Sequence, residues 1–541
     1  MMAAPTMEWP SQVLSDVLAR NAGVRGNEEA LVIDGRRLTH AELEEQVRET
    51  ARGLRALGIR RGDHVAVCMG NALEWVTFFY AAAWIGAVTV PVNTRFKAEE
   101  LKYCLQQADV KLLLVVDRFL KIDFIAMLRE VCPAIDDALP GAELPKLANV
   151  VVLGNDVPRG ALAWRDMLAL GVTCDAPDLD MVGPGDVLLM QYTSGTTSYP
   201  KGVMLTHDNM LRNAAYIAAR IGLSAGDRYY SARPFYHVAG TTLSLLAALT
   251  TGACLLSSSH FDPGVALQVL SDERCAFTSG NDTMFLMILG HPDFGRRPLR
   301  IRGGWVSCGP EVSRKIIDRM GMTGLCHAYG LSEASPNVSM SRRDDDVQKR
   351  IEGWGHVLDG VEVRIVDTTS GQLLPPGRTG EIQVRGWSVM KGYYKMPEQT
   401  AKAIDTDGWL HTGDLGAMDD DGRLRFLTRI KDVFRVGGEN VAPAEVEDVL
   451  HQHPAVKQAQ VVGVPDARLV EVPAAYVILK EGEHATPEEI VAWSKARMAN
   501  FRVPRYVRIV DSFEHIGMTG SAKVQKNKLR AQALIDFGLK A

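Results

Sequence analysis

MQYTSGTTSYPKG, residues 190–202, contains the loop from which the rest of the chain can be interpreted. The apolar run VLLMQY (187–192) that leads into this loop predicts a buried strand. The loop itself has two glycines, five Ser/Thr residues, Pro200 and Lys201. Glycines allow a tight turn, and loop amides, hydroxyls and a lysine together can cradle a polyphosphate. A solvated turn has a similar composition. A Walker A loop is excluded, because that motif needs Gly-Lys-Ser/Thr where Pro200-Lys201-Gly202 stands.

Upstream of the loop, helices alternate with short apolar strands. Thr39 and Glu42 form a predicted capping box for a helix whose apolar residues recur at helical spacing. A strand at 64–68, a buried helix and strand over 75–92, a helix near 97–108 and a strand at 111–116 follow. This alternation predicts parallel sheet covered by helices on both faces. Residues 117–185 show no clear pattern, and we expect them to be irregular.

The composition limits the possible function classes. The chain has 541 residues, a net charge of -5 and 23% charged residues, so no electrostatic argument favours a nucleic-acid partner. Its length predicts a large domain plus a smaller one. Eight scattered cysteines without a CxxC pair argue against a zinc site and a disulfide framework. No secretory signal is recognisable, and the apolar span 75–92 ends in Val-Thr-Val-Pro-Val, which favours burial over a membrane span. We therefore expect a cytoplasmic protein with no transmembrane segment.

Several segments after the loop place chemically useful side chains next to predicted strands. These segments are PFYHVAG (234–240), SCGPEV (307–312), HAYGLSE (327–333) and GWLHTGDLG (408–416). We expect SCGPEV and HAYGLSE to be turns after short strands. Taken singly, each segment has a simpler structural explanation: a packed core histidine, a solvated glutamate or a turn aspartate. Two further stretches are RIKDVFRVGGENVAPAEVE (429–447) and the tail GMTGSAKVQKNKLR (517–530).

In this order, the motifs resemble those of the adenylate-forming superfamily, which includes acyl-CoA synthetases, aryl-CoA ligases, adenylation domains of peptide synthetases and firefly luciferase. The resemblance covers about residues 10–535. It implies an α/β fold with a large N-terminal domain (1–430) of mixed and parallel sheets flanked by helices. A small, mobile α+β C-terminal domain (431–541) would follow.

The resemblance implies where ATP and AMP would bind. Tyr329 would stack on adenine, Ser332 would reach the α-phosphate, and Asp414 would accept the ribose hydroxyls. Glu333 and Thr196 would hold Mg²⁺, for which oxygen ligands are suited. The full nucleotide set is Thr193, Ser194, Gly195, Thr196, Thr197, Lys201, Ser307, Cys308, Gly309, His327, Ala328, Tyr329, Gly330, Ser332, Asp414 and Arg429.

By the same resemblance, His237 would lie at the mouth of the acyl pocket and act in gating or shape. The pocket would be lined by His237, Val238, Thr241, Ala328 and Leu331. These mainly apolar and small residues favour a short or medium aliphatic acid or an aromatic acid, without deciding which.

Two elements of the C-terminal domain would serve the two half-reactions. Asp432 would be the hinge, and the coenzyme A tunnel would be bordered by Arg435, Gly437, Gly438 and Glu439. Lys523 would be the adenylation lysine, catalytic together with Glu333 and His237, and Lys526 would be its outer companion.

The implied activity is ATP-dependent ligation of a carboxylic acid to coenzyme A through acyl-AMP, with ATP and coenzyme A as co-substrates. The chain has no GxSxG elbow, consistent with attack by the substrate carboxylate itself. One alternative is adenylation with another acceptor, such as a carrier protein, or a luciferase-like oxidase. Another is a non-catalytic acyl or nucleotide binder, because Ser198, Gly517 and Ala522 depart from the superfamily pattern. A homodimer is common among such proteins.

Overall fold

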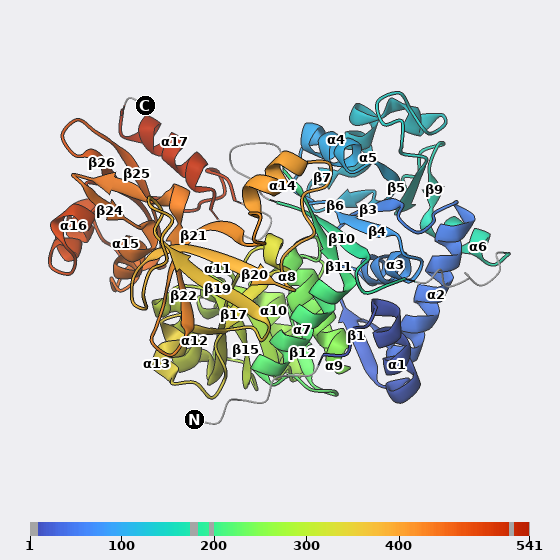
Figure 1. Cartoon of the computed structure of the whole chain (residues 1–541), viewed down its shortest axis with the longest axis horizontal. Helices are drawn as coiled ribbons and strands as arrows, with labels where there is room; N and C mark the ends of the chain where they lie inside the picture. Colours follow the sequence, from blue (N-terminus) through green and yellow to red (C-terminus); the bar gives the residue numbers. More distant parts are fainter. Residues whose placement is uncertain (1–8, 174–181, 194–199, 519–523, 540–541) are drawn as a thin grey trace.

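The computed structural model describes residues 9–173, 182–193, 200–518 and 524–539. Figure 1 shows the segments with the N-terminal colours, around α2–α5, at one end of the molecule and the C-terminal strands and helices at the other. Two large sheets form the body between them, and a small sheet forms the C-terminal part. No helix in the described ranges has the length and apolar character required to cross a membrane.

The first sheet follows the predicted alternation of helices and strands. Its strands pair in parallel, except that β10 and β11 are antiparallel. The strand order is β11 (Gly202–Thr206), β10 (Val187–Tyr192), β4 (Val88–Pro91), β3 (His64–Cys68), β5 (Val110–Val116), β8 (Asn149–Leu153) and β9 (Leu162–Ala163). The predicted phosphate loop connects β10 to β11, so it is the loop of a hairpin at the sheet edge.

The second sheet changes from parallel to antiparallel pairing at its middle. Strand β16 pairs in parallel with β15 and antiparallel with β17. The strand order is β19 (Val361–Val366), β20 (Gly380–Gly386), β21 (Leu410–Met418), β22 (Arg423–Arg429), β18 (Gly355–Val357), β17 (Asn337–Met340), β16 (Gly324–Gly330), β15 (Gly303–Ser307), β14 (Phe277–Asn281), β12 (Arg228–Tyr230), β13 (Cys254–Ser257), β1 (Glu29–Ile33) and β2 (Arg36–Thr39). Ligands bind in open α/β sheets outside the carboxyl ends of parallel strands, so this region is where a site is expected.

Helices separate and cover the two sheets, as the buried side chains show. One core packs α1 (Leu14–Arg25), α2 (His40–Ala56), α3 (Leu73–Trp84), α7 (His207–Ile221) and α9 (Ala247–Thr251) between them. A second core packs α4 (Ala98–Gln107) and α5 (Phe124–Val131) on the outer face of the first sheet. A third packs α10 (Pro263–Asp272), α11 (Asp282–Leu289) and α12 (Pro310–Met320) on the outer face of the second. The result is a sandwich of alternating helical and sheet layers.

The C-terminal sheet has its own two cores. It contains β23 (Phe434–Val436), β24 (Glu439–Val441), β25 (Val456–Asp466), β26 (Val470–Leu479) and β27 (Tyr506–Ile509). One face packs against α15 (Pro443–Leu450) and α16 (Pro487–Lys495), and the other against α17 (Lys526–Asp536). A single turn, η4 (Ile430–Asp432), joins β22 of the large sheet to β23 of the small one.

The remaining elements are short. They are α6 (Trp164–Gly171), α8 (Val238–Gly240), α13 (Val347–Ile351), α14 (Pro397–Ala403), η1 (Pro133–Asp136), the π-helix η2 (Thr241–Leu246), η3 (Ser332–Ala334), η5 (Asn500–Arg502), β6 (Arg118–Phe119) and β7 (Ile122–Asp123).

Two sequence-based expectations are wrong. The region 117–185 is not irregular where it is described, because it contains β6–β9, α5, α6 and η1. Its strands β6, β7 and β9 have only two residues each, too few to show a periodic pattern. The stretch 327–330 is not a turn but the end of β16, held by its pairing with β17. Only the following residues, from Leu331 onward, leave the strand.

Candidate active site

A cavity of about 650 Å³ lies where the carboxyl ends of the parallel strands face the C-terminal sheet. Ser307 ends β15 and Gly330 ends β16, while Arg233 and His237 follow β12 closely in sequence. The lining residues from the large sheets are Thr193, Lys201, Arg233, His237, Val238, Ala239, Leu243, Trp305, Ser307, Ala328, Gly330, Leu331, Ser332, Glu333, Pro336, Asn337 and Arg429. Those from the hinge onward are Lys431, Asp432, Val433, Phe434, Pro443, Val461, Val462, Gly463, Val524, Gln525, Lys526, Asn527 and Arg530.

Tyr393 connects a cation and an anion at one end of the cavity. The Nζ of Lys201 lies 4.2 Å from the centre of the Tyr393 ring, and the Tyr393 hydroxyl donates a 2.9 Å hydrogen bond to Oε1 of Glu333. The loop that carries Lys201 is closed by two contacts with Thr193, N to Lys201 O at 3.1 Å and Oγ1 to Lys201 N at 3.2 Å. This arrangement places a lysine and a carboxylate at a site that could hold phosphate oxygens and a metal ion.

A second polar group lies beside this end, around Asp414. Its Oδ2 accepts a 2.9 Å hydrogen bond from the Tyr329 hydroxyl, and its Oδ1 lies 3.6 Å from Nε of Arg429. The Tyr329 ring stacks on Phe426, with centroids 5.1 Å apart and planes at 11°. Phe426 therefore covers one face of the ring, and adenine could stack only on the other face. Asp414 is 4% exposed, so its carboxylate is held by these partners rather than by bulk solvent.

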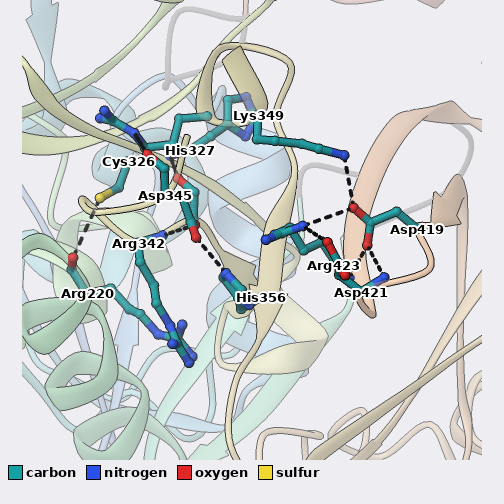
Figure 2. Close-up of polar contacts among 12 residues, drawn as sticks. Arg220, Cys326, His327, Arg342, Asp345, Lys349, His356, Asp419, Asp421 and Arg423 are labelled. Atoms are coloured by element: carbon teal, nitrogen blue, oxygen red, sulfur yellow. Dashed lines mark hydrogen bonds and ion pairs between the residues drawn. The ribbon is translucent and has the colours of Figure 1, made fainter. Parts of the chain in front are cut away.

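Polar contacts behind the cavity fix the strand that carries Tyr329. His327 Nε2 lies 2.8 Å from the backbone oxygen of Cys308, which ties β16 to the segment after β15. Figure 2 shows the adjoining cluster, in which Asp345 contacts His356 at 2.9 Å and accepts a 2.7 Å hydrogen bond from the Arg342 amide. Burial opposes ionisation of Asp345, but these hydrogen bonds outweigh it and hold the pKa of the carboxyl below its usual range. His327 itself is half-buried, and the loss of solvation around its ring lowers its pKa and favours a neutral ring.

The apolar end of the cavity begins at His237, which caps the short helix α8. Its Nδ1 accepts a 3.1 Å hydrogen bond from the Ala239 amide, so in the neutral ring the proton is on Nε2. The chain then continues into the π-helix η2, an irregularity that is frequent at functional sites. Val238, Leu243 and the indole of Trp305 complete this wall.

The C-terminal part closes the cavity with a lysine. Nζ of Lys526 forms an ion pair with Glu447 and donates a 3.0 Å hydrogen bond to the backbone oxygen of Val461. In contrast, Gly437 and Gly438 lie on the turn between β23 and β24 and are not among the lining residues. Arg435 Nε donates a 3.4 Å hydrogen bond to the backbone oxygen of Gly438.

The cavity brings together some of the predicted site residues and not others. It is lined by Thr193, Lys201, Ser307, Ala328, Gly330, Ser332, Glu333, Arg429, His237, Val238, Leu331 and Asp432. The lining does not include Cys308, Gly309, His327, Tyr329, Asp414, Thr241, Arg435, Gly437, Gly438 or Glu439. Of these, Thr241 is wholly buried, and Tyr329 and Asp414 contact Arg429 or each other beside the cavity. Ser194, Gly195, Thr196, Thr197, Ser198, Ala522 and Lys523 lie outside the described residues.

Sequence reasoning missed Arg233, Trp305, Lys431 and Tyr393. Arg233 follows the end of β12, Trp305 lies within β15, and Tyr393 comes from a segment far along the chain. A charged residue in the apolar stretch around PFYH was the one available signal for Arg233. Tyr393 lies in a stretch of the sequence to which we assign no role.

Comparison with known proteins finds similarity over nearly the whole chain. The sequence model described as "AMP-binding enzyme" matches residues 18–394, and that described as "AMP-binding enzyme C-terminal domain" matches residues 445–523. A Bacillus subtilis (strain 168) protein named "Putative acyl-CoA synthetase YngI" is 40% identical, with 97% of each chain covered. The mitochondrial medium-chain acyl-CoA ligase ACSF2 of Homo sapiens is 36% identical, over 93% of this chain and 85% of the relative.

A solved structure with the same fold has an acyl-adenylate bound. The anthranilate CoA ligase AuaEII in complex with anthranoyl-AMP superposes with a TM-score of 0.87 at 25% identity, over 98% of this chain and 100% of the other.

Proposed function

The chain belongs to the family of AMP-binding enzymes, the adenylate-forming superfamily, and on that basis we propose which step of the reaction each residue of its cavity serves. It is an AMP-forming acid–thiol ligase, which joins a carboxylic acid to coenzyme A through an acyl-AMP intermediate. The observation that carries the proposal is that one cavity is lined both by Lys201 of the phosphate loop and by Lys526 of the C-terminal segment. A site closed by both parts suits a reaction whose first step needs a group from each.

In the first step, the acid's own carboxylate attacks the α-phosphorus of ATP and pyrophosphate leaves. Catalysis is then positioning and charge stabilisation, with no protein nucleophile. Lys201 and the Ser/Thr residues of its loop would hold the β- and γ-phosphates, and Arg429 and Asp414 the ribose. Lys523, three residues before Lys526, would bridge the carboxylate and the α-phosphate as negative charge shifts between them.

Magnesium fits the oxygen donors of this site. Glu333 offers a carboxylate at the cavity, and the described residues contain no cluster of three or more His, Cys, Asp or Glu that could form an all-protein cage. A single carboxylate is the pattern for Mg²⁺, which usually keeps waters and binds substrate phosphates. Glu333, with Thr196, would hold the ion, which would neutralise phosphate charge when bound.

The second step would need the C-terminal domain to turn. The Gly437–Gly438 turn does not line the cavity, whereas Lys526 and its neighbours do. We place the boundary at residues 430–431, since η4 connects the two sheets there and offers one short segment to rotate. Rotation about Asp432 would withdraw Lys523 and bring Gly437 and Gly438, with Arg435 and Glu439, to the pantetheine arm of coenzyme A.

The acid is proposed to be of short or medium length, aliphatic or aromatic. His237, Val238 and Leu331 form a mainly apolar entrance, and the relatives include a medium-chain ligase and an anthranilate ligase. Participation in fatty acid metabolism, a cytoplasmic location and a homodimer remain predictions. The seven described cysteines are unpaired and mostly buried, which supports a reducing compartment.

Two variants separate the half-reactions. Lys523→Ala should abolish acid-dependent pyrophosphate release from ATP but leave thioester formation from preformed acyl-AMP. Asp432→Pro should retain adenylation and lose thioester formation, because proline fixes φ at the turn. Lys528→Ala, an exposed lysine of the same segment, is the matched control and should retain both activities. Equal loss of both half-reactions in Lys523→Ala or in Asp432→Pro would refute the assignment.

Assays with and without coenzyme A distinguish the alternative functions. If pyrophosphate forms in an acid-dependent manner but coenzyme A is not consumed, the acceptor is another thiol, such as a carrier protein. If no acid supports pyrophosphate release, the substitutions at Ser198, Gly517 and Ala522 have left a binding protein rather than an enzyme.

A further inference from the structure

Arg233 is a buried cation in the wall of the cavity. The residue is 6% exposed, and it borders the cavity together with Trp305 and Leu243. Its Nε and Nη2 atoms are buried and have no hydrogen-bond partner among the described residues. No carboxylate in the described ranges lies within ion-pair distance of the guanidinium either. A guanidinium is a planar donor group that binds carboxylates well.

A buried, unpaired guanidinium is unfavourable and requires a reason. Removing a charge from water costs several kcal/mol unless an opposite charge or hydrogen bonds replace the water. Burial lowers the pKa of Arg233 to about 10, with Tyr229 and Asp282 opposing the shift. The side chain therefore remains positively charged at neutral pH, and an anion that enters the cavity would relieve the cost.

The surrounding residues hold Arg233 in place without neutralising it. Its guanidinium lies over the Trp305 ring, 4.2 Å from the centroid. The Trp305 Nε1 donates a 2.8 Å hydrogen bond to the Tyr229 hydroxyl, which in turn donates one of 2.9 Å to Ser279. Ser279 continues the chain by donating a 3.0 Å bond to Ser231. This buried network fixes the indole plane, and the indole fixes the guanidinium.

The same network makes this end of the cavity unlike a purely apolar acyl tunnel. Ser231, Ser244 and Ser279 are all buried behind Trp305, and the Oγ atoms of Ser231 and Ser244 are 2.9 Å apart. A hydrocarbon chain would gain nothing from a cation and would leave it unpaired. A polar or anionic group on the acid would instead gain a favourable interaction with this cation.

We propose that the preferred substrate is an acid with a second carboxylate, which binds the guanidinium of Arg233 while the first carboxylate is adenylated. The inference rests on the proposed function and narrows it to dicarboxylic acids, or their aromatic equivalents with two acid groups. The wall of Val238, Leu243 and Trp305 would contact the apolar stretch between the two carboxylates. Arg233 is thus a specificity-determining residue that touches the substrate away from the reacting atoms.

The test compares matched acids in the wild type and in variants. Each pair consists of an unbranched monocarboxylic acid and the dicarboxylic acid with the same carbon count, across chain lengths from three to ten carbons. In the wild type, kcat/KM for thioester formation should favour the diacid of the best-fitting length by roughly 100-fold, because a buried cationic donor rejects an analogue that leaves it unpaired. Arg233→Met should reduce that ratio roughly 100-fold, and Arg233→Lys should give an intermediate ratio, since lysine keeps the charge without the planar fork.

A control arginine separates this effect from a general loss of packing. Arg212 also lies over an indole, 4.4 Å from the Trp387 ring centre, but it does not border the cavity. Arg212→Met should leave the diacid preference at the wild-type value. Equal kcat/KM for both acids in the wild type would overturn the proposal. So would an equal loss with both acids in Arg233→Met.

A binding measurement separates this proposal from the proposed function. The diacid should raise the melting temperature of the wild type more than the matched monoacid does, and Arg233→Met should remove the difference. If no acid supports adenylation but this difference is present, the proposed ligase function fails and the Arg233 site stands. If adenylation occurs and the wild type shows no preference in turnover or in melting temperature, the Arg233 site fails and the ligase function stands.

Discussion

Tyr393 determines how two charged groups face each other at the phosphate end of the cavity. Its ring lies under Lys201, and its hydroxyl donates to Glu333, so one side chain holds both. Tyr393→Phe keeps the ring and removes the hydroxyl. A hydrogen bond to a charged group is worth about 1.5–3 kcal/mol, so we expect adenylation to slow by roughly 10- to 100-fold. The dependence on Mg²⁺ should also shift to higher concentration, because Glu333 would lose its orientation.

The neighbouring Tyr394 supplies the control. Its hydroxyl donates a 3.0 Å hydrogen bond to Asp109, in the region of the first sheet and away from the cavity lining. Acid-dependent pyrophosphate exchange, measured at several Mg²⁺ concentrations, should be normal for Tyr394→Phe. Similar kinetics for Tyr393→Phe and Tyr394→Phe would contradict the positioning role of Tyr393.

At the residue scale, sequence reasoning could predict groups that belong to contiguous motifs. Lys201 and Glu333 are predicted in this way, and both line the cavity. The roles of Arg233 and Trp305 could not be predicted, because they depend on the fold bringing β12 and β15 together so that the two side chains meet. The unpaired state of a guanidinium depends on every neighbour, and a linear pattern contains no such information.

The end of β16 is the element on which the site depends most. Gly330 ends the strand and lines the cavity, and a Cβ at this position would lie 2.0 Å from the backbone oxygen of Pro336. Backbone cannot yield as a flexible side chain can, so Gly330→Ala should destabilise the fold by about 1–3 kcal/mol. The displaced strand end should also raise the KM for ATP, because Ser332 and Glu333 follow directly.

Gly185 is the matched control for this substitution. It is exposed, and a Cβ there would meet no heavy atom within 4 Å. Urea denaturation should give Gly185→Ala a wild-type midpoint and Gly330→Ala a lower one. A wild-type midpoint together with a normal KM for ATP in Gly330→Ala would refute the steric argument.

Elements with strong local signals were predicted well. The predicted capping box of Thr39 and Glu42 is present at the start of α2. The apolar span 75–92 is a buried helix and strand, as predicted. The sequence predicts a turn at residues 327–330. Their strand conformation comes from pairing with β17, which is a tertiary effect.

At the scale of the whole molecule, the sequence predicts mixed and parallel sheets but not which strands of the chain pair with one another. The second sheet joins β1 and β2 from the N-terminus to strands formed beyond residue 225. Such pairing depends on long-range packing and has no local signature. The same holds for the docking of the C-terminal part, where α15 places Asp448 beside Gly309. A Cβ on Gly309 would lie 2.7 Å from Asp448 Oδ1, so glycine makes room for this contact.

Docking of the C-terminal part should depend on pH through Asp448. Burial raises the pKa of its carboxyl to about 7, and Glu447 and Asp282 add to the shift. Glu311 acts in the same direction, while Arg425 opposes it. If the C-terminal part turns away, the carboxyl returns to water and to an ordinary pKa of about 3.9. Docking therefore takes up a proton, and it strengthens as the pH falls from about 7 toward 4.

The expected size follows from these two pKa values. Between pH 8 and pH 6, the docking equilibrium should increase by roughly tenfold, because Asp448 is mainly ionised at pH 8 and mainly protonated at pH 6 in the docked state. Limited proteolysis of the 430–441 junction should accordingly be faster at pH 8. Asp448→Asn should remove this pH dependence, because the amide carries no charge at either pH. Asp511→Asn, at an exposed carboxylate of the same domain, should retain it. A tenfold change that persists in Asp448→Asn would assign the pH effect to another group and leave Asp448 as a packing residue.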